Sequence, residues 1–200
     1  MDRQACLALD EADPLCALAD HFDVPDGVIY LDGNSLGVLP RATAARVADV
    51  VSREWGTDLI RSWNTAGWVD LPQRVGDKIA RLIGAEPGQV VAADSTSLNL
   101  YKVLTVALDL AQVSSAERGA GAPRRVVISE RSNFPTDLYI AQSIVARRGL
   151  ELRLVDSPAD IPAALTDEVA VLMLTEVNYR TGERHDMAAL TAAAHQAGVL

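Results

Sequence analysis

The sequence has few cysteines and histidines, and their spacing matches no metal site. Cys6 and Cys16 lie near the N-terminus without Cys-x-x-Cys spacing, so we expect free thiols in a reducing compartment. The three histidines, His21, His185 and His195, are too far apart to share one helix face. We therefore predict no metal, and we expect the histidines to lie at the surface or at helix ends.

Long hydrophobic runs and nucleotide-binding motifs are also missing. No stretch approaches the roughly eighteen consecutive apolar residues of a membrane span, and no basic segment followed by an apolar one opens the chain. The formal net charge of −9, from 27 acidic and 18 basic residues, opposes binding to nucleic acid or anionic lipid. The sequence contains neither G-x-x-x-x-G-K-[ST] nor G-x-G-x-x-G. We predict a cytoplasmic protein without nucleic-acid or membrane partners.

The composition is that of a globular chain. Hydrophobic residues make up 49% of the 200 residues and charged residues 22%, so a sizeable core can form without metal or disulfide. One domain, or one domain and part of another, is expected from this length.

Apolar periodicity predicts alternating helices and strands. The class is α/β, with a mainly parallel sheet and helices on both faces. A loop rich in Ser, Ala and Gly is expected from Ser114 to Pro123, and the strand near residue 150 suits a sheet edge. The predicted helices are 41–60, 72–83, 97–112, 136–148 and one that Asp186 caps, and the predicted strands are 90–91, 126–128, 150–155 and 169–174.

The last residues indicate a further element. Gly198 ends the helix that Asp186 caps, and Val199 and Leu200 have the character of an opening buried strand. We therefore expect the sequence to be the front part of a longer polypeptide.

In parallel sheets, ligands bind beyond the carboxyl ends of the strands. Asp94-Ser95-Thr96-Ser97 follows one predicted strand and opens a helix, where hydroxyls and free N–H groups form a phosphate cradle. The same residue types are also the preferred helix caps, and on local sequence alone the cap is favoured.

A second candidate lies between the next strand and helix. Phe134-Pro135-Thr136-Asp137 presents an aromatic ring at a rigid turn, where it can stack on a planar cofactor, although Pro and Asp are equally typical of a helix start. Thr175 follows the third buried strand and is a weaker signal, because a single Thr there is usually a local hydrogen-bonding residue.

Two further segments are turn-rich or aromatic. Asp32 to Gly37 contains Asn34 and Ser35 between two glycines, which lets backbone and hydroxyl approach a ligand closely. Trp63 and Trp68 flank a short segment that we expect to be a loop; either ring can wall a pocket or cover the core, and for Trp68 the core is favoured.

Together and in this order, four segments resemble kynureninase, a fold-type-I pyridoxal phosphate enzyme family. The resemblance spans residues 28–200 and about the first half of the family's fold. It implies an N-terminal segment, 1–60, that contributes to a small domain and the substrate site, and the front part of a large cofactor domain, 61–200. The segments are Tyr30 to Gly37, Asp94 to Leu100, Asn133 to Tyr139 and the region Asn178 to Gly182.

The resemblance also implies roles for single residues. Thr96 and Ser97 are expected to hold the cofactor phosphate and Phe134 to stack on the pyridine ring. Asn34, Ser35 and Trp63 are expected to face the substrate. The complete set of expected cofactor-binding residues is Thr96, Ser97, Phe134, Pro135, Thr136, Asp137 and Thr175.

For the intact family member, the implied reaction is hydrolysis of L-kynurenine to anthranilate and L-alanine in tryptophan catabolism and NAD biosynthesis. A 3-hydroxykynurenine substrate and a homodimer fit the same resemblance. The resemblance implies that the family's Schiff-base lysine falls beyond Leu200. Neither Lys78 nor Lys102 is a candidate for it, because both lie inside predicted helices. No catalytic residue is therefore predicted within these 200 residues, and the chain by itself is expected to be inactive.

Two alternatives remain open at this point. Another fold-type-I enzyme, of the cysteine desulfurase or aminotransferase kind, would keep the phosphate cradle but use other substrate contacts. A non-catalytic fragment would use the sheet to bind a partner that covers its apolar edge.

Overall fold

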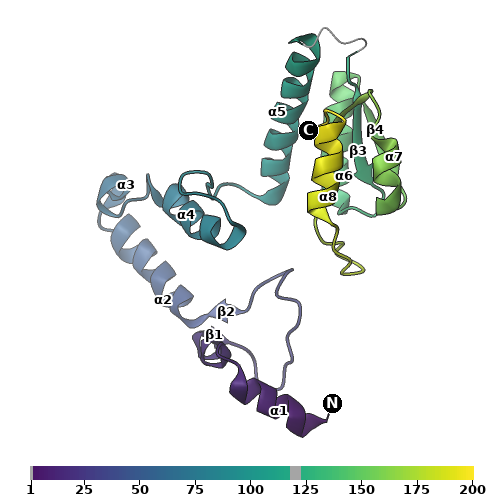
Figure 1. Cartoon of the computed structure of the whole chain (residues 1–200). Helices are drawn as coiled ribbons and strands as arrows, with labels where there is room; N and C mark the ends of the chain where they lie inside the picture. Colours follow the sequence, from purple (N-terminus) through teal and green to yellow (C-terminus); the bar gives the residue numbers. More distant parts are fainter. Residues whose placement is uncertain (1, 118–122) are drawn as a thin grey trace. The chain divides into compact units, whose positions relative to one another are not determined.

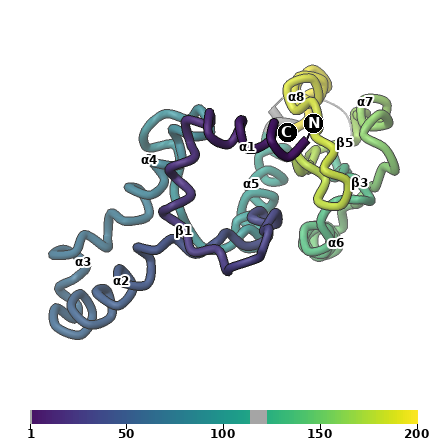
Figure 2. The backbone as a smooth tube through the Cα atoms, turned by 90° about the horizontal axis from the view of Figure 1, so that it is seen from below, coloured from purple at the N-terminus to yellow at the C-terminus, as the bar shows by residue number. Residues whose placement is uncertain are grey.

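The computed structural model describes residues 2–117 and 123–200. Its contacts divide the chain into two compact units, Met1–Ala92 and Ala93–Leu200, which Figures 1 and 2 show in colour from purple to yellow. This division does not coincide with residue 60, and the assignment of 1–60 and 61–200 to a small and a large domain stays a prediction. No helix among the described residues is long and apolar enough to cross a membrane.

The first unit is mostly helical. A short antiparallel pair of strands, β1 and β2, is followed by helices that pass through one π-helical segment, η2. The elements are α1 Arg3–Ala12, η1 Cys16–His21, β1 Phe22–Asp23, β2 Leu39–Pro40, α2 Arg41–Asp49, η2 Val50–Trp55, η3 Leu59–Arg61, α3 Ser62–Thr65 and α4 Leu71–Ile83.

The helix predicted over 41–60 is regular only in its first part. α2 ends at Asp49 and the chain continues as the π-helical turns of η2. Glu54 is buried in these turns, where its carboxylate accepts a hydrogen bond of 2.6 Å from the Trp68 indole N–H and pairs with Arg46 at 2.7 Å. A buried carboxylate needs such partners, and satisfying them coincides with the change of helix type.

The end of α4 confirms its sequence signals. Pro72 lies in the first turn and Gly84 ends the helix in the left-handed region at φ 75°. Gly76 is buried in the middle of the helix, and a Cβ there would lie 2.0 Å from the carbonyl oxygen of Val90. The backbone of the segment after α4 therefore lies directly against the helix at Gly76.

This close approach explains why the strand predicted at 90–91 is wrong. The Val90 carbonyl accepts a hydrogen bond from the Gln73 side chain, and the Ala92 N–H donates to the Pro72 carbonyl. The backbone polar groups of this segment thus pair with α4 instead of with another strand. Val91 is 60% exposed, which a strand covered on both faces would not allow.

The second unit is an α/β layer structure. Its three-stranded parallel sheet has the order β4-β3-β5, so the strand predicted nearest an edge is an edge strand. The elements are α5 Thr96–Glu117, β3 Val126–Glu130, α6 Pro135–Arg148, β4 Glu151–Val155, η4 Pro158–Asp160, α7 Ile161–Ala164, β5 Val169–Leu172 and α8 Met187–Gln196.

Helices cover both faces of this sheet, as predicted. Val127 on β3 packs with apolar residues of α5 and α6, whereas Val126 and Ile128 pack with α7 and α8. Figure 2 shows β3 and β5 lying between α8 and α6. The alternation along β3 explains why all five of its residues are buried.

The backbone at Leu200 runs beside β5. Its N–H donates to the Ala170 carbonyl at 3.2 Å, and its carbonyl accepts from the Leu172 N–H at 2.7 Å, which is the parallel pairing pattern. The helix before it is α8, and the Asp186 carboxylate caps α8 by accepting from the Ala189 N–H. Both features agree with the sequence pattern.

The loop predicted from Ser114 to Pro123 is wrong in its first part. Residues 114–117 continue α5, because Ser and Ala do not stop a helix as Gly or Pro would. Residues 118–122 lie outside the described part of the chain, so that part of the loop is not tested.

Candidate functional site

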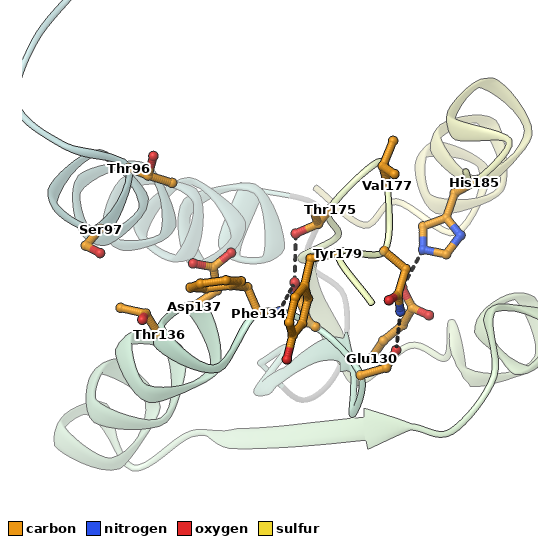
Figure 3. Close-up of a pocket in the computed structure, with 13 residues that line it drawn as sticks. Thr96, Ser97, Glu130, Phe134, Thr136, Asp137, Thr175, Val177, Tyr179 and His185 are labelled. Atoms are coloured by element: carbon orange, nitrogen blue, oxygen red, sulfur yellow. Dashed lines mark hydrogen bonds and ion pairs between the residues drawn. The ribbon is translucent and has the colours of Figure 1, made fainter. Parts of the chain in front are cut away.

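A cavity of about 310 Å³ lies in the second unit, where β3 and β5 end and α5 and α6 begin. Most of the predicted cofactor residues line it together, and Figure 3 shows them converging from several elements. This is the edge at which parallel sheets bind ligands. The lining residues are Thr96, Ser97, Glu130, Ser132, Asn133, Phe134, Thr136, Asp137, Thr175, Val177, Asn178, Tyr179 and His185.

The N-terminus of α5 presents free donors to the cavity. The Ser95 hydroxyl accepts from the Leu98 N–H at 3.4 Å and so acts as the helix cap. The N–H groups of Thr96 and Ser97 have no hydrogen-bond partner among the described residues. Two free amides, two hydroxyls and the positive end of a 22-residue helix dipole suit an anion. The Ser95 cap leaves these donors unused, so the cap does not exclude the predicted phosphate cradle.

The turn before α5 is held by side chains. Asp94 adopts a positive φ of 48°, unusual for a residue with a Cβ, and its carboxylate pairs with the Lys102 ammonium. The Asn99 amide donates to the Ala93 carbonyl at 2.7 Å. These contacts fix the backbone that leads into the amides of Thr96 and Ser97.

Asn133 joins the ends of β3 and β5. Its Oδ1 accepts from the Phe134 N–H and from the Thr175 hydroxyl, both at 2.7 Å, and its Nδ2 donates to the buried Ser129 hydroxyl at 3.1 Å. Thr175 is thus one member of a defined network. The sequence carries only a weak signal for Thr175. In the structure its hydroxyl is held at the cavity wall by Asn133, which lies just after the neighbouring strand, β3.

Phe134 is positioned by the start of α6. It occupies the N-cap position with extended backbone, φ −59° and ψ 131°, because the following Pro135 disfavours helical geometry before it. Its ring is 46% exposed and meets the Tyr179 ring edge-on, with centroids 5.1 Å apart and planes at 68°. Part of Phe134 is therefore accessible at the cavity, and its stacking on a cofactor stays a prediction.

Asp137 lies in the first turn of α6 and lines the cavity with Thr136. Burial raises the pKa of the Asp137 carboxyl above its usual range, because desolvation disfavours the charged form. A carboxyl with a raised pKa in a cavity is typical of a functional site. The raised pKa agrees with the predicted place of Asp137 in a cofactor site, and its role there stays a prediction.

Pro135 does not line this cavity. It faces a second cavity of about 180 Å³, which it shares with Arg131, Ser132 and Arg180 among others. The ring of Pro135 therefore acts on the main cavity through the backbone of Phe134, and direct contact with the cofactor stays a prediction for this residue.

The sequence interpretation missed Glu130 and His185. Glu130 is not among the predicted site residues, and His185 is expected at the surface or at a helix end, but both residues are buried and line the cavity. The two side chains meet at 2.6 Å, between His185 Nε2 and Glu130 Oε2. No motif marks them, because they lie 55 residues apart and meet only when the chain after β5 folds back. His21 and His195 are exposed, as predicted.

The predicted substrate residues lie in the first unit. Ser35 and the exposed Asn34 form a turn in which the Ser35 hydroxyl donates to Asp32 at 2.8 Å. Trp63 is half exposed and lies in α3, so the loop predicted between Trp63 and Trp68 is wrong at Asn64 and Thr65. The cavity is lined by residues of the second unit, and a role of these three residues at the cavity stays a prediction.

Other chemistry is not indicated in the described part of the chain. No group of three His, Cys, Asp or Glu residues there could hold a metal ion. Cys6 and Cys16 are both exposed free thiols, as the sequence predicts.

Curated proteins similar to this chain share one name. The chain is 56% identical over 201 aligned residues to proteins named kynureninase from Burkholderia pseudomallei and Burkholderia mallei. It is 54% identical over 200 residues to the kynureninase of Pseudomonas fluorescens. The resemblance to kynureninase is confirmed.

The kynureninase similarity covers 99% of this chain but 47% of each relative. The chain thus spans about half the length of the kynureninases it matches. No model of a protein family matches the chain.

Proposed function

We propose that this chain forms a pyridoxal phosphate site of a kynureninase, and that the complete protein hydrolyses L-kynurenine to anthranilate and L-alanine. The observation that carries the proposal is one cavity lined by six of the seven residues that the resemblance assigns to the cofactor. The high identity to kynureninases supports the choice of reaction. A fold-type-I architecture, a homodimer and a cytoplasmic location belong to the same proposal.

The residues present fit the cofactor. A cavity of about 310 Å³ is at the lower end of the roughly 300–1,000 Å³ that small-molecule sites occupy. At the start of α5, a phosphate would accept hydrogen bonds from the amides of Thr96 and Ser97. Aromatic surface is supplied by Phe134 and Tyr179. A site with phosphate donors at one helix start and aromatic rings on another wall suits a phosphorylated aromatic ring.

Pyridoxal phosphate, when bound, supplies the electron sink that lets bonds to the substrate's α-carbon and β-carbon be broken. The chain's own residues bind and orient. Thr96 and Ser97 hold the phosphate, Phe134 covers one ring face, and Thr175 offers a hydroxyl held in place by Asn133. Asp137 presents a carboxyl whose pKa is raised by burial, so it holds its proton to a higher pH than an exposed carboxyl does.

The lysine that bonds to the cofactor is not one of the two in this sequence. Lys78 lies in α4, and Lys102 lies in α5 with its ammonium paired to Asp94. Neither lines the cavity. We therefore propose that these 200 residues bind the cofactor without a covalent bond and do not turn over substrate alone. Asn34, Ser35 and Trp63 are proposed to meet the substrate in the complete protein, which can accept 3-hydroxykynurenine as well.

The alternatives make different predictions. A cysteine desulfurase or aminotransferase would share the cradle, but the relatives found at 54–56% identity are named kynureninase. A non-catalytic binding fragment would show no preference for pyridoxal phosphate, and the test below separates it from the proposal.

The test is a titration of the purified chain with pyridoxal phosphate, followed by the cofactor's induced circular dichroism. We expect saturable binding that Ser97→Ala and Phe134→Ala each weaken by about tenfold, since a charge-assisted hydrogen bond and a ring contact are each worth about 1–2 kcal/mol. Ser143→Ala and Tyr139→Ala, at exposed positions on α6, are the matched controls. Equal affinity in all five proteins would refute the site.

A further inference from the structure

We propose that Glu130 and His185 are a positioning pair: they anchor a hairpin whose Tyr179 holds the Phe134 ring in place at the cavity. The hairpin, residues 175–185, follows β5 and forms one wall of the cavity. This inference rests on the proposed function, because it assigns to the pair a role in binding the aromatic cofactor.

The pair is built as an anchor. Glu130 is the last residue of β3 and His185 is the last residue of the hairpin, and their side chains are 6% and 3% exposed. An ionised carboxylate can only accept, so we assign the proton of the 2.6 Å hydrogen bond to His185 Nε2. Removing one member of a buried polar pair leaves the other desolvated without a partner, which is costly.

Backbone hydrogen bonds within the hairpin connect the anchored residue His185 to the tip. Val177 and Arg184 pair as antiparallel residues, the Asn178 N–H donates to the Glu183 carbonyl at 2.8 Å, and the His185 N–H donates to the Glu176 carbonyl at 2.9 Å. These bonds make the outgoing and returning halves one unit. Fixing His185 therefore fixes the position from which Tyr179 projects.

Each end of the hairpin is tied to the end of β3 or to the residues just after it. Thr175 at the outgoing end bonds to Asn133, and His185 at the returning end bonds to Glu130. Near the tip, the Asn178 amide donates to the Ser132 hydroxyl at 3.1 Å, in exposed surroundings. Thr175 and Asn178 are both more exposed than His185, so the buried pair is the tie best protected from water.

Tyr179 is the residue through which the pair acts. Its ring contacts the Phe134 ring at 5.1 Å, as Figure 3 shows beside the hairpin and the pair. Phe134 is 46% exposed, and the contact with Tyr179 restricts the rotation of its side chain. A ring held in its stacking orientation before the cofactor arrives loses less entropy on binding.

The test compares single and double variants of the chain. His185→Ala removes the anchor, His185→Gln keeps an N–H that can reach Glu130, and Tyr179→Ala removes the ring at the hairpin tip. His195→Ala, an exposed histidine on α8, is the matched control. The first measurement is pyridoxal phosphate affinity, and the second is the rate of trypsin cleavage after Arg180 and Arg184, which needs no cofactor.

We expect His185→Ala and Tyr179→Ala each to weaken cofactor affinity by about five- to tenfold, and the double variant to be no weaker than either, because residues acting in series are not additive. His185→Gln should recover most of the affinity. Trypsin should cut the hairpin faster in His185→Ala, but neither in His195→Ala nor in His185→Gln.

Four outcomes are distinguishable. Additive losses, or an unchanged affinity in His185→Ala, would overturn the inference while the cofactor site stands. Unaltered cleavage in His185→Ala would overturn the anchor itself. If His185→Ala does not fold, His185→Gln and Tyr179→Ala still decide: equal losses in these two would contradict the inference. A wild-type chain that ignores pyridoxal phosphate would refute the proposed function, and the cleavage rates would still test the anchor.

Discussion

At the scale of single residues, Asp137 lines the cavity, and its burial there destabilises the folded chain when the carboxyl is ionised. Burial raises its pKa in the folded chain above that in the unfolded chain. The folded state therefore binds the proton more tightly, and stability falls as the pH rises through the range between the two pKa values. Above that range, the ionised carboxylate lowers the free energy of unfolding by a constant amount.

Asp137→Asn should therefore stabilise the chain at neutral pH. The variant should gain in free energy of unfolding relative to wild type, and the gain should shrink as the pH falls toward about 4, where the unfolded carboxyl is protonated. Urea unfolding at a series of pH values measures this difference. The same variant should bind pyridoxal phosphate less well, in a trade of stability against function. A variant that is less stable than wild type at neutral pH would contradict the account of Asp137.

Trp63 gives a prediction about substrate. Because its ring is half exposed, Trp63→Ala should change the free energy of unfolding by less than about 1 kcal/mol. In a catalytically complete protein with this sequence, we expect KM for L-kynurenine to rise by about three- to tenfold, the worth of one aromatic contact, with cofactor affinity unchanged. Steady-state kinetics of anthranilate release measures KM. The reverse pattern, with cofactor affinity lost and KM kept, would remove Trp63 from the substrate site.

The residues of the site were predictable to different degrees. Thr96 and Ser97 lie at a helix start and Phe134 lies between a strand and a helix, features that local sequence reveals, and the structure brings the three residues to one cavity. His185 and Glu130 carry no such local signal. Their burial arises from a hairpin that returns to β3, a long-range event that a pattern within one element does not encode.

At the scale of elements, the packing of α4 against the segment after it requires that residue 76 has no side chain. A Cβ at Gly76 would lie 2.0 Å from the Val90 carbonyl oxygen, so either the helix or the segment must move to admit it. We expect Gly76→Ala to lower the free energy of unfolding by about 1–3 kcal/mol, as overpacking does, despite alanine's better helix propensity. Chemical denaturation measures the change. Leu82→Ala, at a position 85% exposed on the same helix, should change it by less than about 0.5 kcal/mol.

Sequence patterns predicted the elements well where they are long or covered on both faces. α6 and β3 match their predicted ranges closely because Pro135, Gly149 and an apolar run mark them. The two-residue run Val90-Val91 failed because so short a run does not reveal its hydrogen-bond partners. The change to π-helical turns at η2 likewise depends on what Glu54 meets, namely Trp68 and Arg46.

At the scale of the whole molecule, the chain divides its predicted roles between two units. The cavity is lined by residues of Ala93–Leu200, whereas the predicted substrate residues lie in Met1–Ala92. The α/β class, the parallel sheet and its two helical layers followed from the sequence, because repeated buried runs and helices specify that architecture. The boundary between the two units could not be predicted from the sequence. It is defined by contacts in the folded chain and is not marked by a change in composition.

The measurement that tests the central claim most directly is a map of backbone amide NMR shifts in the whole chain, titrated with pyridoxal phosphate. We predict that the largest shifts fall on Thr96 and Ser97, with smaller ones at Phe134 and Thr175, because the phosphate accepts from the α5 amides. Inorganic phosphate should shift Thr96 and Ser97 while leaving Phe134 and Thr175 nearly unchanged. Shifts that leave the start of α5 unaltered and fall elsewhere would contradict the proposed cofactor site.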